Sequence, residues 1–299
     1  MSLSKALALA LASSITLLLA NANPLPDKVR RDPPAPSAYP IGTACPNEWQ
    51  YLNFNPDDPT DQAHLQQLHE VVCGYDIVPL IISGIDAGSH VNGVYLRYFP
   101  NSDAEDDYVA NVLSVYRKLY PQDSGTNLGP LAATFVIDNK DFDDNCADSN
   151  LAYTNTDSID DREKIHFCDL AYTRPDIYHM QCSSFDPYPS TKLDSLSRIA
   201  LHEMCHYSSV GPESSVASQI VDSQNDDGNG AYNPERCHGL VDPAQDDQPA
   251  KTEINADSYA WMAVDAYWSF ACSTTPADSP GYFQDPPHYG DSDDEDDPL

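Results

Sequence analysis

The sequence predicts an α+β domain that is mostly helical, carries a small sheet and is stapled by disulfides. Apolar residues recur at helical spacing in several long stretches, and short apolar runs of strand length lie between them. Eight cysteines are spread over the 299 residues of the chain. About 240 residues between the two terminal segments are enough for one substantial core.

The first part of the chain is typical of a secretory signal peptide. Residues 1–22 contain a lysine near the start, an apolar run and the small-residue cleavage site Ala20-Asn21-Ala22. The dibasic pair that ends at Arg31 predicts a short pro-segment over 23–31. The predicted order continues with a Pro-rich lead over 32–59, a globular domain over 60–275 and an acidic, disordered tail over 276–299. We therefore expect a secreted, extracellular protein.

Periodicity and capping signals place the regular elements of the domain. The capping box formed by Ser102 and Glu105 predicts a helix start, and Ser190 or Thr191 does the same after a Pro-rich loop. The expected helices span 61–72, 102–119, 190–206 and 254–270, and the expected strands span 78–85, 91–99, 132–137 and 164–172. The last strand suits two interpretations equally, an edge strand to which an extended peptide could add and a buried core strand.

Charge and cysteine content narrow the possible functions. Removal of residues 1–31 would leave about 11 basic and 46 acidic residues, a surface that repels nucleic acid and anionic membranes. An even number of cysteines in an exported chain predicts up to four disulfides, and no pair has the CxxC spacing of a metal cluster. Cys205 is expected to form one of these bridges.

The motif HExxH at residues 202–206 is the main functional signal. Residues four apart share one face of a helix, so His202 and His206 can present two imidazoles to one metal ion, with Glu203 beside them. The alternative is a solvated helix that carries two histidines. A catalytic zinc ion needs a third protein ligand, which has to come from downstream. The segment 218–234 offers three aspartates and a tyrosine in a Gly-rich loop.

Three motifs in order resemble the deuterolysin family of zinc peptidases, the aspzincins, which include fungal lysine-specific metalloendopeptidases. They are HExxH, Ala231-Tyr232 and Asn255-Ala256-Asp257-Ser258-Tyr259. The resemblance covers residues 165–272. It implies a zincin-like fold with one Zn²⁺ ion, ligands His202 and His206, Glu203 as general base and Tyr232 as the hydroxyl that stabilises the oxyanion.

The third ligand stays open between several carboxylates. The family places an aspartate three residues before the tyrosine, where this chain has Asn229. We favour Asp222, because the apolar, strand-like lead-in before it would hold it close to the helix. The alternatives are Asp226, Asp227, Glu253 and Asp257.

The resemblance also gives Asp257 a substrate-binding role, as a carboxylate that favours basic side chains. Ala260 stands where the lysine-specific members have a glutamate, so strict lysine specificity is not expected. The predicted function is a monomeric, secreted zinc endopeptidase that acts on polypeptides. The alternatives are a zinc-binding protein or antigen of the same fold without protease activity, and a structural wall protein.

Overall fold

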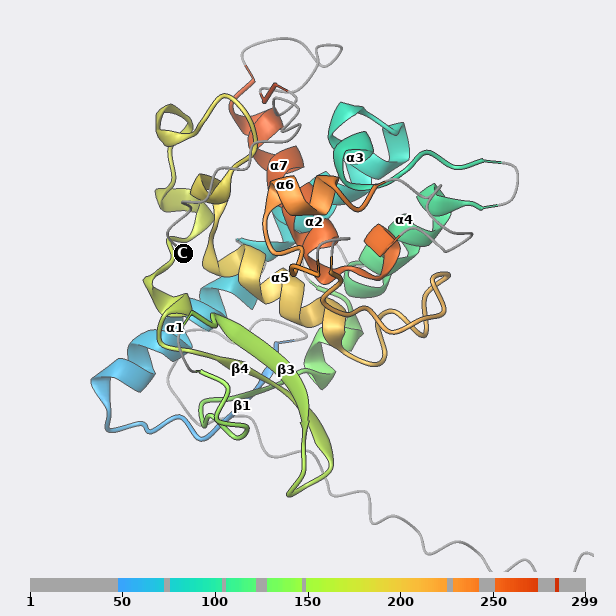
Figure 1. The fold of residues 1–299 in the computed structure, drawn as a ribbon. Helices are drawn as coiled ribbons and strands as arrows, with labels where there is room; N and C mark the ends of the chain where they lie inside the picture. The colour runs from blue at the N-terminus through green and yellow to red at the C-terminus, as the bar shows by residue number, and fades with distance from the viewer. Residues whose placement is uncertain are drawn as a thin grey trace, which may run out of the picture. The chain divides into compact units, whose positions relative to one another are not determined.

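The structure is a computed structural model, and it describes residues 48–72, 76–103, 106–121, 128–146, 149–224, 228–241, 251–273 and 283–284. These residues form an α+β fold with seven α-helices and one four-stranded sheet (Figure 1). The predicted fold class is therefore confirmed at this level. The signal peptide, the pro-segment and most of the acidic tail lie outside the described residues.

The sheet is small and mixed, with the order β1-β2-β4-β3. Its strands are β1 (Gln50–Leu52), β2 (Val136–Asp138), β3 (Ala152–Asp157) and β4 (Arg162–Phe167). The first three in this order run parallel, and β3 pairs with β4 antiparallel, with Thr154 opposite Ile165. Of the two interpretations of residues 164–172, the core strand is correct, because β4 lies between two neighbours. The two edges of the sheet are formed by β1 and β3 among the described strands.

The predicted strands at 78–85 and 91–99 are wrong, because both stretches are helical. They form α2 (Ile77–His90) and α3 (Gly93–Tyr98), joined by Val91 in the left-handed region at φ 46°. The side chain of Asn92 caps α3 by accepting from the Tyr95 N–H at 3.1 Å. A Cβ at Gly84 would lie 2.6 Å from the Tyr116 ring, so this glycine lets another helix pack closely. Tertiary packing overrides the β-branched composition here.

The other predicted elements agree with the structure in type but differ at their ends. Helix α1 (Pro59–Val72) matches its prediction, whereas α4 (Tyr108–Leu119) begins at Asp107, whose carboxylate caps the Ala110 N–H. Residues 130–134 form a 3-10 turn before β2. Residues 32–39, which are expected to be extended, lie outside the described residues, and the later part of the Pro-rich lead contributes β1 and the buried Trp49 to the domain.

Helix α5 (Leu196–His206) lies between the sheet and helices α2 and α7 (Figure 1). It contacts β3 on one side and α7 (Ala256–Ala271) on the other, and α7 also packs on α2. Both α5 and α7 are buried over most of their length, and Leu201 and Met204 are fully buried. Each such side chain contributes roughly 1.5–3 kcal/mol by leaving water. The HExxH motif therefore sits on one of the most firmly packed helices.

The described cysteines form two disulfides and leave two thiols. Cys146 pairs with Cys168, and Cys182 pairs with Cys272. Cys205 and Cys237 are free and buried, so the predicted Cys205 bridge is wrong, whereas two of the up to four predicted disulfides are present among the described residues. Free cysteine behaves as a small buried hydrophobe, which suits Cys205, whereas the Cys237 thiol also donates to the Ala231 carbonyl oxygen at 3.2 Å. Cys45 and Cys73 lie outside the described residues.

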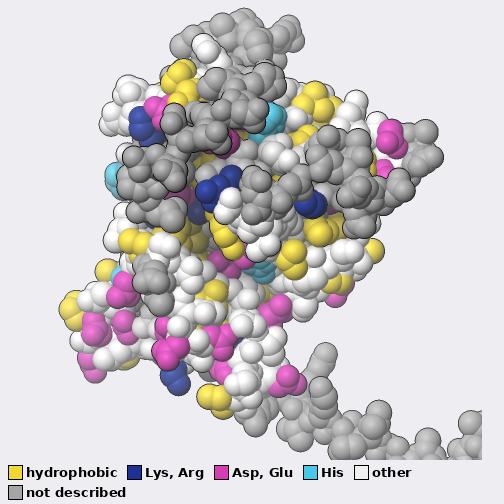
Figure 2. Space-filling model, in the orientation of Figure 1, with side chains coloured by type: hydrophobic (Ala, Val, Ile, Leu, Met, Phe, Trp, Pro, Cys, Tyr) yellow, Lys and Arg dark blue, Asp and Glu magenta, His cyan; other side chains and the backbone are white. Residues whose placement is uncertain are grey.

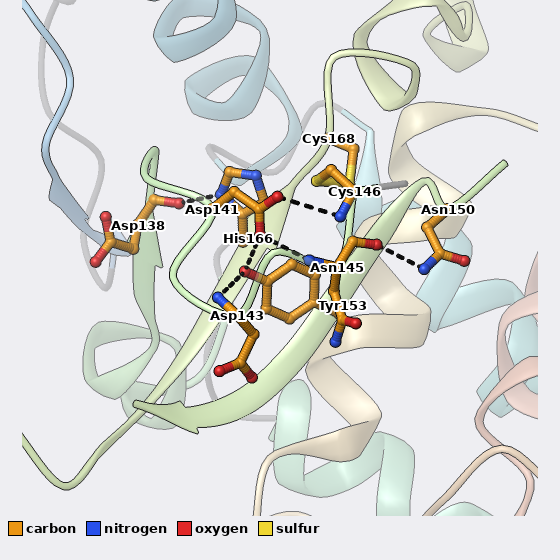
Figure 3. The surroundings of a disulfide bond; sticks show 9 residues. All are labelled: Asp138, Asp141, Asp143, Asn145, Cys146, Asn150, Tyr153, His166 and Cys168. Atoms are coloured by element: carbon orange, nitrogen blue, oxygen red, sulfur yellow. Dashed lines mark hydrogen bonds between the residues drawn. A yellow bond between two sulfur atoms is a disulfide. The ribbon is translucent and has the colours of Figure 1, made fainter. Parts of the chain in front are cut away.

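The first disulfide holds the loop that leads into the edge strand (Figure 3). In this loop the Asp141 carboxylate accepts from the N–H groups of Asn145 and Cys146, at 3.0 and 3.2 Å. It also accepts from the Tyr153 hydroxyl at 2.7 Å, which ties the loop to β3. These contacts fix the start of β3 beside α5.

One residue of the predicted tail is part of the core. Phe283 is 2% exposed and packs against Phe185, with ring centroids 6.2 Å apart. Its carbonyl accepts from Arg97 at 2.6 Å. The prediction that residues 276–299 bury no apolar area is therefore wrong at this position.

The described surface is acidic. On the face shown in Figure 2, Asp and Glu side chains predominate over Lys and Arg around α1 and the β3–β4 hairpin. By length and hydropathy alone, residues 59–90 could cross a membrane, but 67% of their most apolar window is buried inside the protein. Core packing explains this stretch.

Candidate metal centre

The motif helix begins later than predicted. Ser190 caps a short 3-10 turn (Thr191–Leu193), and Ser195 is the N-cap of α5, where its hydroxyl accepts from the Arg198 N–H at 3.2 Å. A serine at this position satisfies one of the free N–H groups of the first turn. From this start, His202 and His206 fall on one side of the helix, in its last two turns.

The two imidazoles face each other with their Nε2 atoms 3.0 Å apart. Each ring is held from behind through Nδ1. His206 Nδ1 lies 3.0 Å from the Ile220 carbonyl oxygen, and His202 Nδ1 lies 2.9 Å from an Asp257 carboxylate oxygen. A carbonyl only accepts, so Nδ1 of His206 carries the proton and Nε2 keeps a free lone pair. A carboxylate partner has the same effect on His202.

Asp222 completes the group. Its Oδ1 lies 3.2 Å from Nε2 of His202 and 3.2 Å from Nε2 of His206. Val221 places it there by forming a parallel bridge with Asn255, with its N–H donating to the Ile254 carbonyl at 2.8 Å. The strand-like lead-in thus holds Asp222 beside the helix. Together, His202, His206 and Asp222 could hold one metal ion, and we call these three residues the metal group.

The electrostatics of the group favour charge on each member. Burial would raise the pKa of Asp222, but hydrogen bonds from His202 and His206 outweigh it and hold this pKa below its ordinary value. Burial would likewise lower the pKa of His206, but the hydrogen bond to Asp222 outweighs it and raises this pKa. A metal ion would therefore compete with protons for the two imidazoles.

Glu203 lies beside the group and is 3% exposed. Its Oε1 is 3.9 Å from His202 Nε2, and its Oε2 accepts a hydrogen bond from the Thr154 hydroxyl at 2.7 Å. Thr154 belongs to the edge strand β3. One carboxylate oxygen is thus held by the sheet while the other faces the metal group.

Tyr232 lies beside the group and is 52% exposed. Its ring centroid is 6.4 Å from that of His202. Burial, followed by the charge and hydrogen bonding of Asp222, raises the pKa of Tyr232 to about 12. The hydroxyl therefore stays protonated at neutral pH and can donate a hydrogen bond.

Asp257 does not occupy the substrate-facing position predicted for it. It is 1% exposed, and its Oδ1 contacts His202 and the Arg198 guanidinium, the latter at 2.6 Å. A substrate side chain cannot reach a carboxylate enclosed in this way. The local sequence places Asp257 in the first turn of α7, and the packing of α7 on α5 turns it inward behind the imidazoles.

The other candidate ligands are not at the site or are not described. Asp226 and Asp227 lie outside the described residues. Glu253 accepts from the Asn111 side chain at 2.9 Å and faces α4. A second group of metal-binding residue types, Cys146, His166 and Cys168, also comes together, but its two sulfurs are joined in a disulfide.

Two residues that support the site could not be picked out from the sequence. Thr154 gave no signal, because it precedes Glu203 by 49 positions and only the packing of β3 against α5 brings them together. Arg198 offered a weak signal, since it is a charged residue one helical turn before His202 in an otherwise apolar stretch. An arginine at a packed position requires an acidic partner.

No family model matches this chain, and a search of curated proteins found no match to it. The candidate centre is therefore defined by its own residues and geometry: two imidazoles and one carboxylate with their donor atoms within 4.8 Å of one another.

Proposed function

We propose that the protein is a secreted, zinc-dependent endopeptidase with a zincin-like fold, similar to the deuterolysin family. The donor triangle of His202, His206 and Asp222 carries this proposal. Its edges are 3.0, 3.2 and 3.2 Å. A tetrahedral zinc ion with bonds near 2.05 Å separates its ligands by about 3.3 Å, so the donor set fits zinc without large rearrangement. The two nitrogens and one oxygen are also donors that zinc prefers.

Zinc at this place would act as a Lewis acid and would lower the pKa of a water molecule to about 7. The chain supplies the proton transfer. Glu203 is the general base: its Oε1 accepts a proton from the attacking water and then returns it to the leaving amine. Thr154 keeps the other oxygen of Glu203 occupied, so that one oxygen remains available for proton transfer.

Tyr232 would stabilise the negative charge that develops on the substrate carbonyl oxygen. A protonated hydroxyl beside Asp222 can donate a hydrogen bond to the carbonyl oxygen as negative charge develops on it, the kind of interaction that usually contributes most to catalysis. The fold also offers a strand along which an extended peptide substrate could bind. The strand β3 ends the sheet among the described residues, so a substrate backbone can pair with it next to Glu203.

The test combines metal content with hydrolysis. The purified full chain should contain about one zinc per molecule and should cleave casein, and a chelator should abolish cleavage. Glu203→Gln should keep the zinc and lose the cleavage, because the amide cannot accept a proton. Stoichiometric zinc with no cleavage at any pH from acid to neutral would favour the zinc-binding protein instead. Absence of stoichiometric metal would leave the structural wall protein.

A further inference from the structure

Arg198 lies one helical turn before His202 on α5 and is enclosed by the fold. It is 6% exposed, and its guanidinium remains charged in such surroundings. A buried guanidinium needs acidic partners, and Arg198 has two. Its Nε donates to Asp194 at 2.7 Å, and its NH1 donates to Asp257 at 2.6 Å.

The contact with Asp257 reaches the metal group directly. One oxygen of this carboxylate, Oδ1, contacts both the Arg198 guanidinium at 2.6 Å and His202 Nδ1 at 2.9 Å. The other oxygen, Oδ2, is buried with no hydrogen-bond partner among the described residues. The orientation of Asp257 therefore depends on Arg198, because the only other polar contact found for this carboxylate among those residues is the imidazole that it supports.

Arg198 is also connected to Tyr232, through Trp261. The central carbon of its guanidinium lies over the Trp261 ring, 4.8 Å from the ring centroid. The Trp261 indole N–H donates to the Tyr232 carbonyl oxygen at 3.2 Å. The guanidinium thus donates to Asp257 and at the same time lies over the Trp261 ring, a combination that the point charge of lysine cannot reproduce.

We propose that Arg198 is a positioning residue that holds the metal ligand His202, through Asp257, and the hydroxyl-bearing Tyr232, through Trp261, in one arrangement. The inference rests on the proposed function, because it gives these two residues their roles in metal binding and catalysis. In this arrangement one side chain, Arg198, fixes both His202 and Tyr232, which lie on different segments of the chain. Removal of Arg198 should therefore weaken metal binding and catalysis together.

The test compares Arg198→Met with the matched variant Arg97→Met in the full chain. Arg97 forms an equally buried pair with Asp265 on the same helix α7, at 2.9 Å, but does not contact the metal group. Zinc affinity is measured by chelator competition on the folded protein. We expect Arg198→Met to weaken zinc binding about tenfold or more, as loss of a residue that orients a ligand typically does, and Arg97→Met to leave it unchanged.

Two further variants separate the two connections. Trp261→Phe keeps a ring under the guanidinium but loses the N–H, so kcat should fall while zinc affinity stays the same. Arg198→Lys keeps a donor for Asp257 but loses the stacked plane, so zinc affinity should change less than in Arg198→Met while kcat still falls. Unchanged zinc affinity and unchanged kcat in Arg198→Lys would contradict the proposal even if Arg198→Met did not fold.

The ¹⁵N NMR signals of His202 in metal-free protein provide a readout that does not depend on zinc. These signals should change in Arg198→Met and not in Arg97→Met, because only the first frees Asp257. Identical His202 signals and identical zinc affinities in the two variants would overturn the positioning role. If the unaltered protein bound no zinc, the proposed function would fail, and the His202 signals would still decide whether Arg198 positions that ring.

Discussion

Two aspartates of α7 each pair with a buried arginine from another helix, with the same chemistry and different consequences. Arg198 contacts Asp257 at 2.6 Å near the start of the helix, and Arg97 contacts Asp265 at 2.9 Å two turns later. Both carboxylates are almost fully enclosed. In the first pair, Asp257 also contacts His202 of the metal group. In the second pair, Arg97 also donates to the Phe283 carbonyl oxygen.

The pKa values of the buried carboxylates show what their partners do. Burial would raise the pKa of Asp257, but the charges of His202 and Arg198 outweigh it and lower this pKa. Asp265 faces Arg97 without an imidazole, and there burial raises the pKa. In this comparison burial is overcome only where two cationic partners converge, which is also where the metal group is built.

The largest difference between the pairs should appear when each aspartate is truncated. Asp265→Ala leaves Arg97 buried without its carboxylate and should cost about 3–5 kcal/mol of unfolding free energy. Asp257→Ala should cost less, because Arg198 keeps Asp194, but should weaken zinc binding about 10–100-fold. Chemical denaturation and zinc competition measure the two effects. Equal zinc affinities in the two variants would contradict the prediction that only the pair of Arg198 and Asp257 supports metal binding.

Phe283 tests whether the second pair serves stability alone. Phe283→Ala should lower the unfolding free energy by about 3 kcal/mol, because a buried ring is lost, and should leave zinc affinity and kcat unchanged. Phe270 on α7 is 83% exposed, so Phe270→Ala is a matched control with an expected change below about 0.5 kcal/mol. A loss of zinc affinity in Phe283→Ala would link this region to the metal group.

On the other side of the metal group, β3 holds Glu203 through the neutral hydroxyl of Thr154 and not through a charged partner. Thr154→Val removes the hydroxyl and keeps the shape, so kcat should fall about tenfold, the value of one lost hydrogen bond to a charged group. Thr154→Ser should restore it. Thr156 is an exposed threonine on the same strand, and Thr156→Val should have no effect. Steady-state hydrolysis of a peptide gives these values.

Asp76 is a buried carboxylate without an arginine, and it gives the smallest expected effect. Burial raises its pKa to about 6, although the Ser197 hydroxyl donates to it; the charges of Asp176 and Glu70 add to the rise and His179 opposes it. The folded state thus binds this proton more tightly than the unfolded state, so stability is lost as pH rises from about 4 through 6.

Asp76→Asn should remove this loss. The variant should be more stable than the unaltered protein at pH 8 by roughly 1–3 kcal/mol, with the gain vanishing below about pH 4. Denaturation at several pH values measures it. Asp86, whose side chain is 70% exposed, provides the control, and Asp86→Asn should show no comparable pH dependence. A gain of the same size at every pH would mean that the Asp76 proton is not its source.

The local part of the site follows from residues close together along the chain. Spacing of four residues places His202 and His206 on one face of any helix, and the apolar lead-in before Asp222 indicated a strand-like segment that the structure pairs with Asn255. Helix α1 and the class of the fold followed from periodicity in the same way. These features depend on neighbours along the chain, so a linear pattern contains them.

The other features of the site depend on contacts between distant parts of the chain. The tertiary structure made residues 77–90 a helix packed on α7, joined β3 to α5 through Thr154 and Glu203, and turned Asp257 away from substrate toward Arg198 and His202. Arg198 and Asp257 are 59 residues apart, and Thr154 and Glu203 are 49 residues apart. Contacts of this kind arise when burial brings distant elements together and forces each enclosed charge to find a partner, which no local pattern specifies.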